Sequence, residues 1–333
     1  MSLPARSRLA VLALLVLGPI GGLFALDLAI ARATPFWAWV VASFPRRIDD
    51  SFLAEATLRA TRPGRDNVLL LGNSRADDGI DLAALENRFT GRGLHFRNLT
   101  VVGSGPVDEA MRARDVARLE PSAVIAVVAA SELRDADGTG ETFSYDEAAA
   151  RYIFPASDFA ARPEFHLAGL VGELHVLARH RRSLQNALMV RLGRLTFLSI
   201  EMDLLRMARE RMAGSRGPKV PVEWMSRVEL DPYPNDNTRA LEFLAETLHA
   251  AGTRLIVVEA PSHLIQEAPK VRPRMERFRR YVADLAAQHG FVFLDASAFP
   301  PLELDQFKDL IHVNDSGRFT YTSALGDQLE SLL

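Results

Sequence analysis

The chain has 333 residues, of which 48% are hydrophobic and 24% charged, and its formal net charge is −3. This balance excludes a disordered or collagen-like protein and gives no indication of nucleic-acid binding. The chain has no cysteine, which excludes a disulfide framework, a thiolate zinc site and a cysteine nucleophile. No acidic or histidine cluster has the spacing of a metal site, so neither a metal nor another cofactor is expected.

The first segment of the chain has the pattern of a membrane anchor. Arg6 and Arg8 precede a run without charged residues over positions 9–26. Continued to Ala31, a helix here would be roughly 33 Å long, about the thickness of a bilayer core. The arginines predict a cytoplasmic N-terminus and export of the following chain to the periplasm or another extracytoplasmic space. We therefore expect a single transmembrane helix within residues 1–32.

A cleaved signal peptide is the alternative, with the Ala-Ile-Ala tripeptide at 29–31 as its processing site. The uncharged run is longer than the apolar core of an ordinary signal peptide, which favours the anchor. Aromatic residues then follow where a membrane protein meets the bilayer surface, namely Phe36, Trp37 and Trp39. Residues 33–66 are expected to form a juxtamembrane connector, and both interpretations export the body of the chain.

Five short apolar runs predict the strands of a parallel sheet. They lie at 67–72, 94–99, 123–130, 254–259 and 291–295. Helix-patterned segments separate most of them, at 81–89, 107–119, 238–251 and 274–289, and a last one covers 316–333. Strands that alternate with helices form βαβ units, so we predict an α/β domain over residues 67–333 with helices on both faces of the sheet.

One interval interrupts this alternation. Residues 137–236 contain no clear strand, and their middle part, 166–212, is rich in the helix-forming residues Leu, Arg and Met. We interpret the interval as a helical insertion between the third and fourth strands. A lid, a substrate platform and a surface for a partner or the bilayer are the roles it suggests.

Ligands of open α/β sheets bind at the carboxyl ends of the strands, so the residues that follow the strands are candidates for chemistry. Gly72-Asn73-Ser74-Arg75 follows the first strand. A serine at this point is exposed at the sheet edge, and its N–H can help to stabilise an oxyanion. An ordinary turn with a helix cap is the alternative.

Four further residues follow later strands or precede the last helix. Gly103 lies in a glycine-rich loop after the second strand, where an N–H can be left to donate to a ligand; a plain loop is the alternative. Asp309 precedes His312 by three residues, so the carboxylate can accept the Nδ1 proton and leave Nε2 as a base. His263 follows the fourth strand and is a candidate for contact with the substrate.

In their order and context, these segments resemble the SGNH/GDSL hydrolase superfamily over about residues 67–333 without the insertion. The resemblance implies a flavodoxin-like three-layer α/β/α sandwich with a five-stranded parallel sheet. It implies Ser74 as nucleophile, His312 as base and Asp309 as the acid that orients His312. The backbone N–H groups of Ser74 and Gly103 would be the oxyanion donors. Residues expected to bind the substrate are Asn73, Arg75 and His263.

Two features depart from the common pattern of that superfamily. Asn73 stands where most members have aspartate, and the third motif, whose asparagine completes the oxyanion hole, is not recognisable at 131–135. Both departures are similar to those of membrane-anchored SGNH-like proteins of cell-envelope modification, such as alginate O-acetylation proteins and the D-alanine transfer protein of teichoic acid assembly.

The leading hypothesis is therefore a membrane-anchored, extracytoplasmic esterase or O-acyltransferase acting on an acylated envelope or secreted glycan. Attack by Ser74 on an ester would give an acyl-enzyme, which water hydrolyses or a sugar hydroxyl accepts. The sequence leaves hydrolysis and transfer open. One alternative is a catalytically silent SGNH-like domain that binds glycan or partners a membrane-bound acyltransferase. A lipase-like enzyme of membrane lipid is another, suggested by the anchor alone.

Overall fold

The computed structural model describes residues 32–43, 50–133, 146–154, 233–261, 272–309 and 311–333, together with residues 22, 25, 29 and 30. The predicted anchor at 9–31, apart from those four positions, lies outside the described residues. The same holds for most of the predicted helical insertion and for His263. In the part of the chain that is described, no helix is both long and apolar enough to cross a membrane.

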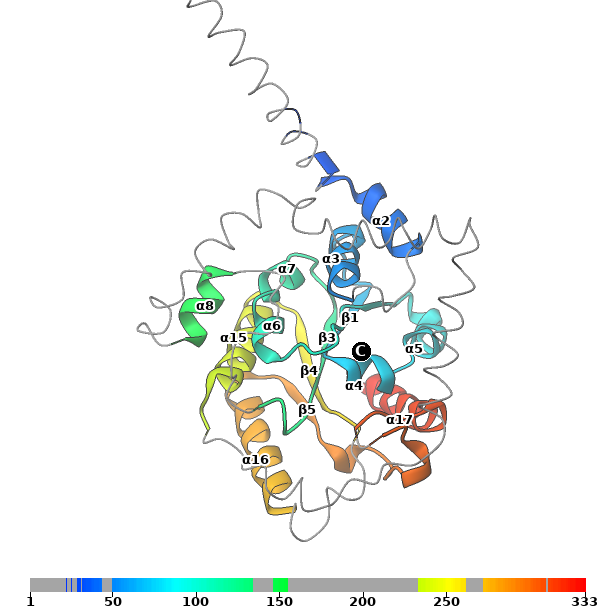
Figure 1. Cartoon of the computed structure of the whole chain (residues 1–333), viewed down its shortest axis with the longest axis vertical. Coiled ribbons are helices and arrows are strands. Elements are labelled where there is room, and N and C mark those ends of the chain that lie inside the picture. The colour runs from blue at the N-terminus through cyan, green and yellow to red at the C-terminus, as the bar shows by residue number, and fades with distance from the viewer. Residues whose placement is uncertain are drawn as a thin grey trace, which may run out of the picture.

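Five parallel strands form one sheet in the order β2-β1-β3-β4-β5, which confirms the predicted sheet (Figure 1). The strands are β1 (Asn67–Leu71), β2 (His95–Asn98), β3 (Ala123–Val128), β4 (Arg254–Glu259) and β5 (Val292–Leu294). Every residue of β1 and β3 is buried, as expected for continuous apolar runs between two helical layers. This strand order is the flavodoxin-like one, and its switch point lies between β1 and β3, where such sheets bind ligands.

Helices cover both faces of the sheet (Figure 1). One layer consists of α6 (Pro106–Ala110), α7 (Ala113–Ala117), α8 (Glu147–Ile153), α15 (Asp236–Ala250) and α16 (Arg272–His289). The other consists of α4 (Ser74–Gly79), α5 (Leu82–Phe89) and α17 (Asp315–Leu332). Alternate strand residues enter the two cores: Leu69 and Val124 pack under the first layer, whereas Leu70 and Ile125 pack under the second. The described elements therefore form the predicted three-layer α/β/α sandwich.

Two predicted elements differ from the structure in ways that affect the site. The predicted helix at 107–119 is divided into α6 and α7, because the buried Arg112 side chain turns back to donate to the carbonyls of Asp108 and Leu99. The predicted strand at 123–130 ends at Val128, because the next N–H, that of Ala129, is bonded to the Glu132 carboxylate.

The predicted connector contains two helices, α2 (Thr34–Ser43) and α3 (Asp50–Ala60). Trp37 of α2 is fully buried and meets Phe52 of α3 edge to face, with the ring centroids 6.0 Å apart. Trp37 therefore does not lie exposed, as a residue at the bilayer surface would, whereas Trp39 is 46% exposed. Leu58 of α3 packs against the core under α6 and α7, which joins the connector to the sandwich.

Candidate active site

A sharp turn after β1 presents Ser74 at the carboxyl edge of the sheet. Gly72 has φ +139°, and a Cβ there would lie 2.6 Å from Cβ of Ala76, so the turn requires glycine. Asn73 caps α4, since its side-chain oxygen accepts the N–H of Arg75 at 3.0 Å. Ser74 is therefore the first residue of a helix, directly beyond a buried strand.

His312 and Asp309 reach Ser74 from the loop that precedes α17. His312 Nε2 lies 2.8 Å from Ser74 Oγ, and its Nδ1 lies 2.8 Å from Asp309 Oδ2. A carboxylate only accepts hydrogen bonds, so the neutral ring carries its proton on Nδ1 and turns an unprotonated Nε2 toward the hydroxyl. The three side chains therefore have the order of a nucleophile, a base and an acid that orients the base.

The loop around Asp309 is fixed by hydrogen bonds of its own. Asp309 Oδ1 accepts the N–H groups of Ile311 and His312, each at 2.8 Å. Burial opposes ionisation of Asp309, but these bonds and the His312 ring outweigh it and lower the pKa of the carboxyl below its ordinary value. Lys308 in the same loop pairs with Asp78 of α4 at 2.8 Å, which binds the loop to the helix that begins at Ser74.

Two backbone N–H groups near the turn are the expected oxyanion donors. Gly103 has φ +79° in the loop after β2, and Ser74 opens α4. No backbone hydrogen bond recorded for the described residues uses either N–H. The loop is held against the nucleophile turn, because the Val101 N–H and the Ser104 hydroxyl both donate to the Gly72 carbonyl, at 2.9 and 3.2 Å.

Asn73 and Arg75 were expected to bind substrate, but both side chains are hydrogen-bonded to other side chains of the protein. The Asn73 amide donates to Glu132 at 2.7 Å, and Arg75 donates to the Ser131 hydroxyl at 3.1 Å. Arg75 Nε also lies 3.8 Å from Glu132 Oε1. Glu132 was missed by the sequence analysis, because 131–135 lacks a recognisable motif. Its place directly beyond β3, at the switch point, is the signal that marks it.

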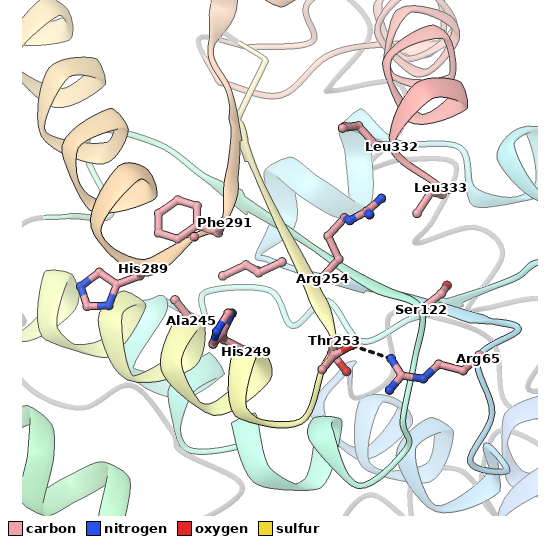
Figure 2. Close-up of a pocket in the computed structure, with 13 residues that line it drawn as sticks. Arg65, Ser122, Ala245, His249, Thr253, Arg254, His289, Phe291, Leu332 and Leu333 are labelled. Carbon is pink, nitrogen blue, oxygen red and sulfur yellow. Dashed lines mark hydrogen bonds between the residues drawn. The ribbon is translucent and has the colours of Figure 1, made fainter.

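A cavity lies at the opposite edge of the sheet. It measures about 470 Å³ and is lined by residues that precede or begin strands, among them Arg65, Ser122, Arg254 and Phe291 (Figure 2). Arg65 is held there by the Gly252 carbonyl at 2.7 Å. This amino edge carries none of the candidate residues. Across the described ranges, no group of three or more His, Asp or Glu side chains is arranged to hold a metal ion.

No protein-family model and no curated protein matches the chain. Among solved structures, it is similar to that titled "Crystal Structure of TesA", with 13% identity, a TM-score of 0.41 and coverage of 80% of this chain and 99% of that one. It is also similar to Axe2, an acetylxylan esterase from Geobacillus stearothermophilus, with 12% identity, a TM-score of 0.36 and coverage of 81% and 95%. Structural similarity at these scores does not indicate a function. The function is therefore inferred from the geometry of the site.

Proposed function

We propose that the chain is an SGNH-type serine esterase or O-acyltransferase. The observation that carries the proposal is the continuous path from Asp309 through His312 to Ser74, in which both links measure 2.8 Å. A serine hydroxyl is a weak nucleophile at neutral pH, and an adjacent base whose ring is oriented by a carboxylate is the arrangement that activates it. The location of the site at the carboxyl edge of the sheet supports the same conclusion.

The chemistry follows from the placement of these groups. Ser74 Oγ attacks the ester carbonyl carbon while its proton passes to His312 Nε2, and the carbonyl oxygen becomes an oxyanion. The N–H groups of Ser74 and Gly103 donate to that oxyanion. The bond to the leaving alcohol then breaks, and the alcohol oxygen takes the proton from His312. An acyl ester on Ser74 remains.

A second hydroxyl compound completes the cycle. It gives its proton to His312 and attacks the acyl carbon. The bond between that carbon and Ser74 Oγ then breaks, and Ser74 Oγ takes the proton back from His312. Water in this role releases the acid, whereas a sugar hydroxyl gives an acylated sugar. The His312 side chain is 21% exposed and that of Asp309 is 52% exposed, so solvent reaches the base. We therefore expect hydrolysis whenever no acceptor is bound.

The substrate that we propose is an acylated glycan of the envelope or a secreted polysaccharide, with a membrane-bound acyltransferase as a partner. The domain would be held outside the cytoplasm by the anchor at 9–31. The composition of α2 supports this location, because it is apolar around its whole circumference and begins eight positions after the end of the uncharged run. Its outer side chains Trp39 and Val41 are 46% and 39% exposed, as suits contact with the bilayer surface.

A fluorophosphonate probe tests the proposed chemistry independently of the substrate. The full chain should be labelled stoichiometrically at Ser74, and a Ser74→Ala variant with an unchanged Tm should take no label. Release of acetate from an acetylated oligosaccharide, and transfer to an added sugar, then separate hydrolysis from transfer. Absence of label on folded wild-type protein would contradict the proposal that the chain is a serine esterase or O-acyltransferase.

A catalytically silent glycan-binding or scaffold protein is the second candidate, and one observation favours it. The side chain beyond β3 that contacts the nucleophile turn is Glu132, and a carboxylate has no proton with which to stabilise an oxyanion. Binding of an oligosaccharide by folded protein that takes no fluorophosphonate label would support this candidate.

A further inference from the structure

Asn73 joins the three loops that follow β1, β2 and β3. Its side-chain nitrogen donates to Glu132 Oε1 at 2.7 Å, beyond β3, and to the Ser104 carbonyl at 3.4 Å, beyond β2. The two proposed oxyanion donors flank these contacts directly, because Ser74 follows Asn73 and Gly103 precedes Ser104. The Asn73 amide group therefore links the two segments that carry these donors, in addition to the bonds that Val101 and Ser104 make to the Gly72 carbonyl.

Glu132 in turn fixes the orientation of that amide. Its side chain is 13% exposed, and both of its oxygens have partners. Oε1 accepts from Asn73, and Oε2 accepts the N–H of Ala129 at 3.0 Å. The guanidinium of Arg75, 3.8 Å away, supplies the opposite charge that a largely buried carboxylate requires. Burial raises the pKa of the Glu132 carboxyl, while Arg75, Asn73 and Ala129 oppose the shift.

We infer that Glu132 is a positioning residue for the proposed reaction: through Asn73 it holds the N–H groups of Ser74 and Gly103 at the spacing that an oxyanion requires. The inference rests on the proposed function. Glu132 itself does not touch the reacting atoms in this role, because its two oxygens are occupied by Asn73 and Ala129. Its charge is compensated by Arg75, which limits the repulsion that a nearby oxyanion would meet.

Glu132→Gln is the variant that tests this role, since it keeps the shape of the side chain. A glutamine has one acceptor oxygen, so either Asn73 or Ala129 would face an NH2 group and lose its bond. Displacement of an oxyanion donor affects the transition state more than the bound ester. With p-nitrophenyl acetate, we expect kcat to fall by about 10- to 100-fold, while KM changes by less than about threefold. The rate of fluorophosphonate labelling at Ser74 should fall with kcat.

Glu259→Gln is the matched control. Glu259 is also a buried carboxylate at the carboxyl end of a strand, 2% exposed, and it accepts from Arg279 at 2.8 Å and from the Ala296 N–H at 3.0 Å. The hydrogen bonds and the ion pair of its side chain within the described part of the chain involve Arg279 and Ala296, not the proposed catalytic residues. Glu259→Gln should lower Tm and leave kcat per folded molecule unchanged.

The outcomes separate the inference from the function on which it rests. If wild-type protein takes label and Glu132→Gln behaves like Glu259→Gln, with a lower Tm and unchanged kcat, Glu132 is only structural and the inference is wrong. If folded wild-type protein neither takes label nor cleaves the ester, the proposed function is wrong and the positioning role of Glu132 is rejected with it.

Discussion

Asp309 holds His312 at two points. Its Oδ2 lies 2.8 Å from the ring Nδ1, and its Oδ1 accepts the backbone N–H of the same residue at 2.8 Å. Both the ring and the backbone of His312 are therefore hydrogen-bonded to the same carboxylate. These bonds fix the tautomer of the ring and the direction in which Nε2 points. The lowered pKa keeps this carboxylate ionised throughout the neutral range, so it remains an acceptor wherever His312 serves as the base.

Asp309→Asn should leave the fold intact and reduce ester turnover by about 10² to 10³-fold. The amide favours the wrong imidazole tautomer and removes the charge that stabilises the imidazolium. His312→Ala should be at least as damaging, and the double variant should add little, because the two residues act as a unit. Turnover measured beside thermal melting checks this. Full activity in folded Asp309→Asn protein would show that Asp309 takes no part in the reaction. Multiplicative losses of turnover in the double variant would show that Asp309 and His312 act independently.

Gly72→Ala should destabilise the protein by about 2 kcal/mol or more and abolish labelling of Ser74. The new Cβ would lie 2.6 Å from Cβ of Ala76 and 3.3 Å from Val127, at a φ of +139° that other residues rarely adopt. Gly91→Ala is the matched control, because its added Cβ would have no atom within 4 Å outside the adjacent chain. Denaturant unfolding of both variants provides the measurement. Equal stabilities would show that the turn relaxes without cost.

Glu109 should make the stability of the protein depend on pH. Burial raises the pKa of its carboxyl to about 8, an effect that Arg112 opposes and that Glu132 and Asp108 increase. The unfolded chain releases this proton near its ordinary value of about 4.3. The resulting stabilisation is complete below that value and is lost as pH rises toward 8. The wild-type Tm should therefore fall between pH 5 and pH 8.

Glu109→Gln should flatten this dependence and raise the Tm at pH 8, because an amide keeps the buried site neutral. Glu276→Gln changes an exposed carboxylate of α16 and should retain the slope of the wild type. Thermal melts at three pH values compare the variants. If the Tm of wild type and of Glu109→Gln changed with pH in parallel, the pH dependence would not come from Glu109.

The N-terminal segment should remain attached to the mature protein. We expect protein extracted from membranes to retain residues 9–31, since the uncharged run is longer than the apolar core of a signal peptide. N-terminal sequencing of that protein is the measurement. A mature chain that begins at Arg32 would show cleavage after the Ala-Ile-Ala tripeptide.

Much of the sheet was predictable from the sequence, because a strand buried on both faces leaves a continuous apolar run. The runs at 67–72 and 254–259 correspond to β1 and β4 within one residue. The spacing of Asp309 and His312 indicated their contact, since three residues in a loop suffice for the carboxylate to reach the ring.

The environment of Asn73 was not predictable in the same way. Its partner Glu132 lies 59 positions away, and only the order of the strands shows that their loops meet. For the same reason, composition did not reveal that Trp37 is covered by Phe52 of α3, whereas Trp39, two residues later, is exposed. Long-range contacts that depend on topology leave no local pattern.

The distance along the chain between Ser74 and His312 has a consequence for biosynthesis. These residues are 238 positions apart, and His312 lies just before the helix α17. A growing chain therefore carries the proposed nucleophile long before the proposed base is made. If export proceeds from the N-terminus, the reactive serine stays dormant during passage. The proposed activity would then begin only after the loop that carries His312 has folded against α4, on the side of the membrane where we expect the substrate.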